Sequence, residues 1–487
     1  MSSSQGQKFY ITTTLPYVNA EPHIGHAMEF VRADVIARHK KLLGYDVFFN
    51  TGTDEHGTKI LEGALKEGLD VQVYVERNAA RFKELFPKLG IADDIHFIRT
   101  TDERHVRAAQ EMWKRCNDNG YIYKKEYEAT YCVGCELYKT DSELVDGKCE
   151  IHPNREIEII KEENYFFAFS KLEKKLLELY EKNPTLVVPP FRFNEIKSFV
   201  TRGLEDFSIS RLKEKMSWGV PVPGDDAHVM YVWFDALTSY ISTLGWPDES
   251  LDFSFWEHGT PVQYCGKDNL RQQSAIWQAM LLAADVPSTA NIIINGFIIS
   301  GGQKMSKSIG NVINPFDVIE MFKGITDFPE DVLRFVLLHE IPSFEDGDIT
   351  LESIKVAYSA HLANGIGNLT SRIMKMATTN LTEGIRPEPQ AFPDEYTQAL
   401  ANFDSKKALE FVMKEVGSLD GYIQSTEPFK VIKVDQEKGK ALIEDMRARL
   451  YNIARLLQPF LPKTSDRIKS CIQSHAMPEK PLFNRLP

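Results

Sequence analysis

Two short segments far apart in the chain carry side chains suited to phosphate chemistry. The first is PHIGH, residues 22–26, in which His23 and His26 flank Gly25. Imidazoles can donate hydrogen bonds to a phosphate as its charge grows in a transition state, and a glycine beside them lets a flat ring or a phosphate approach the backbone. Taken alone, this segment is equally well explained as a helix-capping loop with incidental histidines.

The second segment is a glycine-rich stretch that ends in KMSKS, residues 304–308. Lys304 and Lys307 surround Met305 and Ser306, and Ser308 closes the motif. Two lysines on a mobile loop suit a leaving pyrophosphate, because ammonium groups act as movable point charges. A pair of lysines by itself is more simply explained as a solvated surface loop, so this segment carries weight only together with the first.

A third group has the spacing of metal ligands. Cys132, Cys135, Cys149 and His152 form the pattern C-x2-C-x13-C-x2-H. Two close pairs separated by a loop are typical of a zinc knuckle, and a closed set of three thiolates and one imidazole predicts one structural Zn²⁺ rather than a catalytic one. The alternative, three buried thiols and a surface histidine, does not account for the pairing.

The elements that would position these residues are alternating strands and helices. The β-branched and aromatic segment Lys8–Leu15 predicts a strand, and a helix with one apolar face is expected from Ile24 to a stop at Gly44. Val47–Asn50 predicts a second strand. Strand, helix and strand in this order indicate a parallel crossover unit, in which ligands bind beyond the carboxyl ends of the strands.

Polar and charged residues follow five predicted strands, and one crevice could collect them all. The strands are Lys8–Leu15, Val47–Asn50, Val229–Val232, Val262–Cys265 and Asn291–Ile294, and they lead into PHIGH, TGTDEHG, WFDALTSY, GKDN and KMSKS. After Gly324 the pattern becomes helical, with long periodic segments at Leu351–Thr378 and Lys438–Leu457. The second part of the chain therefore predicts a helical bundle.

Length and composition agree with a cytoplasmic, multi-domain globular protein. The chain has 487 residues, of which 43% are hydrophobic and 26% charged, and this length predicts three or four domains at roughly 100–200 residues each. No apolar run approaches the ~20 residues that span a bilayer, and the N-terminus lacks a signal-peptide core. A net charge of -12 argues weakly against nucleic-acid binding, although a local basic face can exist on an acidic protein.

PHIGH followed by KMSKS resembles the paired motifs of class I aminoacyl-tRNA synthetases, and KMSKS matches that pattern at all five positions. The resemblance implies a Rossmann-type catalytic domain in which an amino-acid carboxylate attacks the α-phosphate of ATP, with Mg²⁺ present and pyrophosphate released, before transfer to the 3′ end of tRNA. It implies catalytic roles for His23, His26, Lys304 and Lys307. The implied ATP-binding residues are His23, Gly25, His26, Gly266, Asp268, Lys304, Met305, Ser306, Lys307 and Ser308.

Several segments are similar to the methionyl branch of this class, which implies methionine and tRNA(Met) as partners. The resemblance implies that Asp54 holds the α-ammonium group and that Trp233 packs on the thioether, whose sulfur is polarizable. The implied methionine pocket comprises Thr14, Leu15, Tyr17, Asp54, Trp233, Ala236, Leu237, Tyr240, Asn269 and Gln273. Gln273 stands where the family usually carries a histidine, so the fine shape of the pocket departs from the family pattern.

The expected domain order is a catalytic domain split by a connective insert, followed by an all-α anticodon-binding domain. The expected limits are 1–115 and 226–323 for the catalytic halves, 116–225 for the zinc-knuckle insert, 324–355 for a helical linker and 356–487 for the anticodon domain. The insert is too short for the editing domains of branched-chain synthetases, which need a second sieve because one methylene gives only about 1–3 kcal/mol of discrimination. The zinc ligands are expected to lie away from PHIGH.

The helical part contains GNLTSR, residues 367–372, which resembles the family's anticodon motif. The resemblance implies that Asn368 and Arg372 read base edges. Phe429, after Pro428, stands where the family uses a tryptophan, and a phenylalanine can still stack on a base at about 1–3 kcal/mol. No further dimerisation module follows, so a monomer is expected.

Two other functions remain open at this point. A small-molecule adenylyltransferase shares an HxGH motif on a similar fold, but it would not need a zinc insert or a helical anticodon module. A degenerate synthetase kept as a tRNA-binding protein is the non-enzymatic alternative, and the intact His23, His26, Lys304 and Lys307 argue against it.

Overall fold

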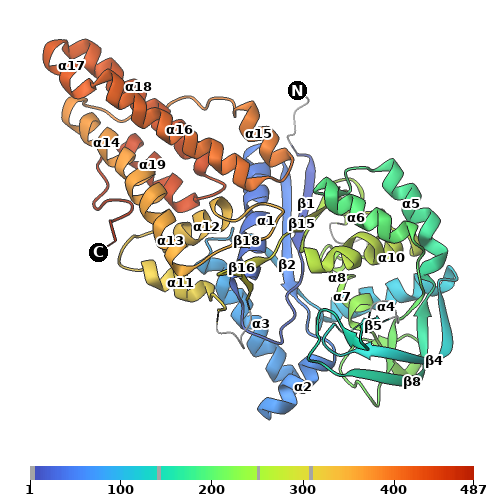
Figure 1. Cartoon of the computed structure of the whole chain (residues 1–487). Helices are drawn as coiled ribbons and strands as arrows, with labels where there is room; N and C mark the ends of the chain where they lie inside the picture. Colours follow the sequence, from blue (N-terminus) through green and yellow to red (C-terminus); the bar gives the residue numbers. More distant parts are fainter. Residues whose placement is uncertain (1–5, 136, 140–143, 249–252, 306–310, 487) are drawn as a thin grey trace.

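The computed structural model describes residues 6–135, 137–139, 144–248, 253–305 and 311–486. The chain forms an α/β body from which an elongated arm of helices extends (Figure 1). The body contains the N-terminal part of the chain and the arm contains the C-terminal part. The predicted α/β body followed by a helical bundle is confirmed.

The body is built on a six-stranded sheet in which every pairing is parallel. In sheet order its strands are β3 (His96–Arg99), β2 (Asp46–Thr53), β1 (Lys8–Thr13), β14 (Thr260–Gly266), β15 (Asn291–Asn295) and β9 (Val187–Val188). From β1 the chain runs outward through β2 to β3. Later in the sequence, β14 pairs with the other side of β1. The strand order therefore reverses between β1 and β14, and ligands bind at such a switch point.

One of the five strands expected at this edge belongs elsewhere. The segment predicted as Val229–Val232 forms β13 (Asp225–Met230), which pairs antiparallel with β11 (Ser210–Leu212) and β12 (Pro221–Val222) in a separate small sheet. Gly224, at φ +77°, provides the tight turn between β12 and β13. Pairing two strands that are joined by so short a turn costs little loop-closure entropy. This favours the local pairing of β12 with β13 over pairing with the distant parallel sheet.

The helices of the body cover both the sheet and its ends. Helix α1 (Ile24–Leu42) begins one residue after His23 and ends two residues before Gly44, close to the predicted limits. It contacts β1, β2 and β14 as well as α12, so it is buried on most of its surface. The remaining longer helices of the body are α2 (Thr58–Glu67), α3 (Val71–Lys88), α4 (Glu103–Asp118), α10 (Trp277–Ala283), α11 (Pro315–Phe322) and α12 (Pro329–His339).

The segment between the two halves of the sheet is a long antiparallel hairpin followed by two helices. Strands β4 (Ile122–Cys132) and β8 (Ile157–Phe167) pair along their whole length. Helices α5 (Glu173–Lys182) and α6 (Pro190–Thr201) follow, and β9 between them pairs with β15. The expected insert thus returns to the central sheet at Val187–Val188, inside the predicted range 116–225.

The arm is a bundle of helices whose distal end is α17 (Pro428–Val434) (Figure 1). Its two longest members are α16 (Ser405–Thr426) and α18 (Gln436–Leu457). The predicted helix Leu351–Thr378 forms as α13 (Leu351–Ala357), a π-helical stretch Tyr358–Gly367 and α14 (Asn368–Asn380), with non-helical backbone at Gly365. The bundle is completed by α15 (Asp394–Ala401) and α19 (Pro462–Ser474). None of the described helices is both long and apolar enough to cross a membrane.

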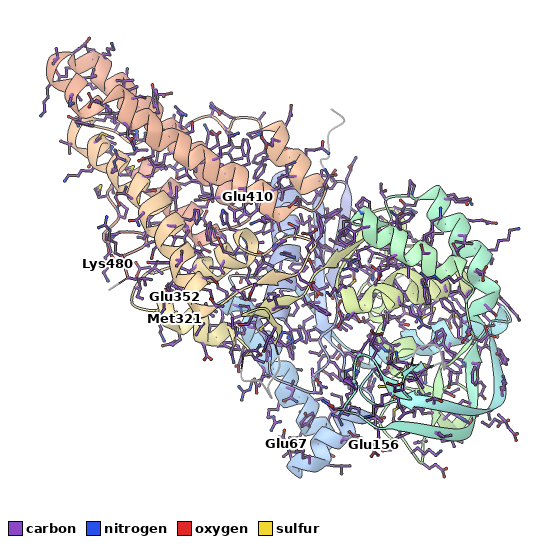
Figure 2. All side chains as sticks on the ribbon, viewed as in Figure 1. Glu67, Glu156, Met321, Glu352, Glu410 and Lys480 are labelled. Carbon is purple, nitrogen blue, oxygen red and sulfur yellow. The ribbon has the colours of Figure 1, made fainter. Side chains whose placement is uncertain are left out.

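A buried arginine, Arg334, joins the arm to the body. Arg334 on α12 and Asp34 on α1 are both fully buried, with Nη2 and Oδ2 2.8 Å apart. Arg334 also donates to the carbonyl oxygens of Phe460 at 2.7 Å and Pro459 at 2.8 Å, just before α19. Glu410, labelled in Figure 2, lies on α16 and pairs with Lys406, which donates to the carbonyl oxygen of His339 at the end of α12. The charge of Arg334 is thus compensated from both sides of the joint.

We expect Asp34→Ala to lower the free energy of unfolding by about 3–5 kcal/mol, because it leaves the Arg334 guanidinium buried without its counter-charge. Urea denaturation followed by circular dichroism measures this change. Glu111→Ala, which breaks the partly exposed Arg115–Glu111 pair, should cost no more than about 1 kcal/mol. Equal effects of the two variants would contradict the assignment of the joint to Asp34 and Arg334.

Candidate active site

A cleft of about 450 Å³ lies beyond the carboxyl ends of β1, β14 and β15. It collects residues from the loops that follow these strands and β2, from the start of α1 and from the short helices α7 (Val232–Ala236) and α8 (Ser239–Ser242). The residues proposed from sequence that line it are Thr14, Leu15, Tyr17, His23, Gly25, His26, Asp54, Trp233, Ala236, Leu237, Tyr240, Gly266, Asp268, Asn269 and Met305. The structure therefore brings together segments from five regions of the chain.

The two histidines of PHIGH cap α1 and stack on each other. His23 Nδ1 accepts a hydrogen bond from the backbone N–H of Gly25 at 3.1 Å, and His26 Nδ1 accepts from the backbone N–H of His23 at 3.2 Å. Their ring centroids are 3.8 Å apart. Because each Nδ1 is an acceptor, the proton of each neutral ring must be on Nε2. Both rings can therefore act as donors from Nε2.

The electrostatics of this corner favour neutral imidazoles beside an anion. Burial, with a smaller contribution from His23, holds the pKa of His26 well below its usual range. The N-terminal end of α1, a 19-residue helix, adds partial positive charge at the same place. The corner is suited to phosphate oxygens, because it offers hydrogen-bond donors from the two imidazole rings rather than charged side chains.

The other end of the cleft is apolar and has one carboxylate at its edge. Trp233, Ala236 and Tyr240 form an aromatic and aliphatic wall. Asp54 lies at the end of β2, where its backbone N–H donates to the carbonyl oxygen of Pro16 at 2.9 Å. Its position is therefore tied to the loop that follows β1. An ammonium group beside Asp54 would place an attached apolar chain against the wall.

Gln273 does not line the cleft, although sequence comparison placed it in the pocket. It is fully buried behind Tyr240, and its Nε2 donates to the Tyr240 hydroxyl oxygen at 2.5 Å. Gln263 Nε2 in turn donates to Gln273 Oε1 at 3.0 Å, and Gln263 accepts from Thr289 Oγ1 at 2.5 Å. Since the amide nitrogen occupies an acceptor position of the Tyr240 oxygen, the hydroxyl proton is left to point elsewhere. Gln273 acts on the wall by holding Tyr240.

Glu29 is a cleft residue that the sequence analysis missed. It lies three residues after His26 on α1, and its Oε1 accepts from the backbone N–H of Thr14 at 2.7 Å. Burial at the floor of the cleft raises the pKa of Glu29 to about 8, and Asp268 nearby adds to this rise. The i, i+3 spacing from His26 was the available signal, because residues at this spacing share a helix face. Further lining residues that the sequence analysis did not name include Lys59, Asn295 and Phe297, and Cys135, predicted only as a metal ligand, also lines the cleft.

The four predicted metal ligands lie together. The donor atoms of Cys132, Cys135, Cys149 and His152 are all within 4.8 Å of one another, with Cys135 Sγ 3.3 Å from Cys149 Sγ and 3.2 Å from His152 Nδ1. Thiolates bound at ~2.3 Å to a tetrahedral zinc lie about 3.8 Å apart, so a small outward shift would accommodate the ion. A Cβ at Gly134 would lie 2.4 Å from the His152 ring, so glycine is needed there. The donor set fits a closed metal site.

The cluster borders the cleft, which corrects the expectation that it lies away from PHIGH. Cys135 is one of the residues that line the cleft together with His23 and His26. Lys59, at the start of α2, donates from Nζ to the carbonyl oxygen of Gly134 at 2.8 Å. Cys132 ends β4 and the other three ligands lie in the segment that joins β4 to β8, so this hairpin carries the cluster to the cleft. This arrangement depends on tertiary packing that ligand spacing cannot predict.

The start of KMSKS is held in a hairpin beside the cleft. Gln303–Lys304 forms β17, which pairs with β16 (Ile298–Ser300), and the backbone N–H groups of Gly301 and Gly302 donate to Asp348, both at 2.8 Å. Met305 lines the cleft. Ser306, Lys307 and Ser308, and the side chain of Lys304, lie outside what the structure describes.

The three residues expected to meet the anticodon lie on the arm. Asn368 is exposed at the start of α14, and Arg372, one turn later, pairs with Asp420 on α16. Phe429 is 45% exposed on α17, which directly follows α16 at the distal end of the arm. All three therefore lie on helices of the arm, remote in sequence from the cleft.

Known proteins match both the sequence and the fold. A family model described as tRNA synthetases class I (M) matches residues 9–155 and 140–374, so the parallel sheet and its histidine corner are those of a class I tRNA synthetase. A "Methionine--tRNA ligase" of Brucella suis is 38% identical over 480 residues, covering 95% of this chain and 91% of that protein. A protein of the same name from Thermotoga maritima is 36% identical over 97% of this chain and 76% of its own length. The chain belongs to the methionine–tRNA ligase family.

Solved structures agree with this assignment. Mycobacterium tuberculosis methionyl-tRNA synthetase in complex with methionyl-adenylate superposes with a TM-score of 0.89 at 33% identity, covering 98% of this chain and all of that one. The free-state structure of the same enzyme gives a TM-score of 0.83 at 31% identity, with 99% of each chain covered. The similarity therefore extends over both the body and the arm.

We expect Glu29→Gln to change how stability depends on pH. The native pKa of Glu29, about 8, is above that of an unfolded glutamate, so the native state binds the extra proton between about pH 4.3 and 8. The stability contributed by this proton is complete at low pH and is lost as pH rises through the native pKa. The glutamine variant should therefore gain stability relative to the wild type from pH 5 to pH 8. Thermal unfolding at several pH values measures this, and parallel curves would contradict it.

Proposed function

We propose that this chain is a methionine–tRNA ligase that activates L-methionine with ATP and Mg²⁺ and then transfers it to the 3′ end of tRNA(Met). The observation that carries the proposal is the cleft itself. Hydrogen-bond donors at the start of α1 face one end, and an apolar wall with the Asp54 carboxylate forms the other. An amino acid and a nucleoside triphosphate could therefore meet between His26 and Trp233.

In the first step, the methionine carboxylate attacks the α-phosphate and pyrophosphate leaves. No side chain forms a covalent bond, so the protein contributes positioning and charge stabilisation. His23 and His26 would donate from Nε2 to phosphate oxygens as negative charge develops. Lys304 and Lys307 would neutralise the departing pyrophosphate, and Ser306 and Ser308 would complete its loop. Gly25 and Gly266 would leave room for the nucleotide, with Asp268 at its ribose.

Methionine would be selected by the two features of the apolar end. Asp54 would pair with the α-ammonium group, while Trp233, Ala236 and Tyr240 would surround the thioether, which packs well on aromatic edges. Gln273 would support this pocket through Tyr240. Thr14, Leu15, Tyr17, Leu237 and Asn269 would complete the walls.

The cluster of Cys132, Cys135, Cys149 and His152 would hold one Zn²⁺. Three thiolates and one imidazole satisfy a tetrahedral ion without an open position, so the ion would have a structural role. Its binding would stabilise the hairpin that supports the rim of the cleft, because the binding energy of such a site contributes to folding.

The arm would recognise the anticodon, while the body would carry out both chemical steps in the cytoplasm. Asn368 and Arg372 would contact base edges, and Phe429 would stack on a base. The ion pair with Asp420 would restrain the Arg372 guanidinium before tRNA arrives. The proposed domain limits stay at 1–115, 116–225, 226–323, 324–355 and 356–487, and a monomer is proposed, which light scattering would test.

Amino-acid-dependent ATP–pyrophosphate exchange, measured with each of the twenty amino acids, tests the proposed reaction. We expect exchange with methionine alone, because only this side chain combines the length and polarizability that the pocket accepts. Exchange with another amino acid would overturn the substrate. ATP binding without any exchange would favour an adenylyltransferase, and tRNA binding without exchange would favour a degenerate synthetase.

The variant His26→Ala should lower kcat for exchange by about 10²–10³-fold with a much smaller effect on methionine binding, because the lost donor acts mainly in the transition state. Steady-state exchange kinetics measure this separation. His258→Ala is the control, since this histidine is exposed and follows α9 (Ser254–Glu257) outside the cleft. An equal loss in kcat for both variants would argue against the assigned role.

The variant Cys149→Ala should bind no zinc and melt at a lower temperature, because three remaining ligands leave the site open. His152→Cys should keep one zinc per chain, since a fourth thiolate also completes a tetrahedral set. Elemental analysis and thermal melts of both variants test the site. Metal-free wild-type protein with the same melting curve as the purified protein would refute a structural zinc.

A further inference from the structure

Three buried side chains behind the cleft form a hydrogen-bonded set. Asp235 lies on α7, His56 follows Asp54 in the loop after β2, and His105 lies on α4. Asp235 Oδ2 is 2.6 Å from His56 Nδ1, and Asp235 Oδ1 is 2.6 Å from His105 Nε2. Among the described residues that line the cleft, none of the three is found. The set therefore supports the walls without contacting what the cleft holds.

The hydrogen bonds define the protons of this set. A carboxylate only accepts, so each imidazole must donate from the nitrogen that faces Asp235. The other ring nitrogen of His105, Nδ1, lies 3.0 Å from the hydroxyl oxygen of Ser242. Burial alone would raise the pKa of Asp235, but His56 and His105 outweigh it and lower that pKa to about 2. An ionised carboxylate without solvent exposure thus holds both rings in one orientation.

Asp235 connects the two parts of the apolar end of the cleft. It lies between Trp233 and Ala236 in the chain, and both of these line the cleft. His56 is two residues after Asp54, the carboxylate at the edge of the same end. The bond from Asp235 to His56 therefore spans the gap between the wall and the loop that carries Asp54. Trp218 Nε1, in the segment between β11 and β12, also donates to the backbone oxygen of Glu55 at 2.6 Å, which gives the same loop a further contact.

We propose that Asp235 is a positioning residue for amino-acid selection, which sets the spacing between Asp54 and the wall formed by Trp233 and Ala236. The inference rests on the proposed function. All α-amino acids present the same ammonium group, so the distance from Asp54 to the wall determines which side-chain length fits. A shift in this spacing weakens the binding of methionine in the ground and transition states alike. Among the described residues, none at the start of α1, the nucleotide end of the cleft, forms a hydrogen bond with Asp235, His56 or His105.

The test compares the Michaelis constants for methionine and ATP in Asp235→Asn. The amide can accept from only one imidazole and presents an N–H group to the other, so the hydrogen bonds that tie His56 to α7 and α4 are no longer all satisfied. We expect the KM for methionine to rise about tenfold, as small displacements of binding groups do. The KM for ATP and the kcat should change by less than about threefold, because uniform binding of one substrate is lost.

Two variants of His105 separate positioning from packing. His105→Gln keeps an N–H donor that can reach Asp235, whereas His105→Leu has a similar size and no donor. We expect the leucine variant to raise the KM for methionine and the glutamine variant to stay closer to the wild type. Asp331→Asn serves as a control for stability, since this buried carboxylate accepts from the N–H of Thr464 at 2.6 Å in the joint between α12 and α19. It should lower the melting temperature without changing the KM for methionine.

The proposal is overturned if Asp235→Asn keeps the wild-type KM for methionine, or if it loses methionine and ATP equally. Wild-type protein without methionine-dependent exchange would instead refute the proposed function. In that case, calorimetric titration of methionine into the wild type and Asp235→Asn decides the inference. Weaker binding to the variant supports it, and equal affinity or no binding to either protein refutes it.

Discussion

Two buried charges of opposite sign on α1 hold the parts of the molecule together. Arg32 donates to Asn295 Oδ1 at 2.9 Å and to the backbone oxygen of Ser343 at 2.8 Å, while Asp34 pairs with Arg334. A buried charge that loses its partner costs several kcal/mol, so these contacts tolerate little movement. Since α1 begins at Ile24, directly after His23, one helix positions the end of β15, the joint with the arm and the histidine corner.

The cleft is built in two layers with different tasks. The inner layer contacts the cleft, and it combines neutral donors at one end with an apolar wall at the other. The outer layer contains Gln273 and Asp235, which contact Tyr240 and His56 rather than the cleft. Buried polar side chains with satisfied hydrogen bonds restrict the wall to one arrangement. In the proposed function, selection of the amino acid would therefore depend on residues that do not contact it.

The cluster of three cysteines and His152 lies directly at the cleft, whereas the arm contacts the body at a distance from it. The cluster reaches the rim through Cys135 and the bond from Lys59 to Gly134, so it supports one edge directly. The arm contacts the body through α12, and its distal helix α17 lies far along the arm (Figure 1). A closed donor set suits the first task and a stiff bundle of long helices suits the second.

The sequence by itself determined the features that depend on neighbours in the chain: the limits of α1, the parallel crossover from β1 to β2, the helical arm and the ligand spacing from Cys132 to His152. Caps, periodicity and spacing are local properties, so they can be recognised in the sequence before the fold is known. Only the tertiary structure decided that Val187–Val188 returns to the central sheet, because a two-residue strand has no period to detect. It also placed the cluster beside the cleft and Gln273 behind Tyr240. These positions result from packing between segments distant in sequence, and residue type and spacing do not record which buried side chain faces which neighbour.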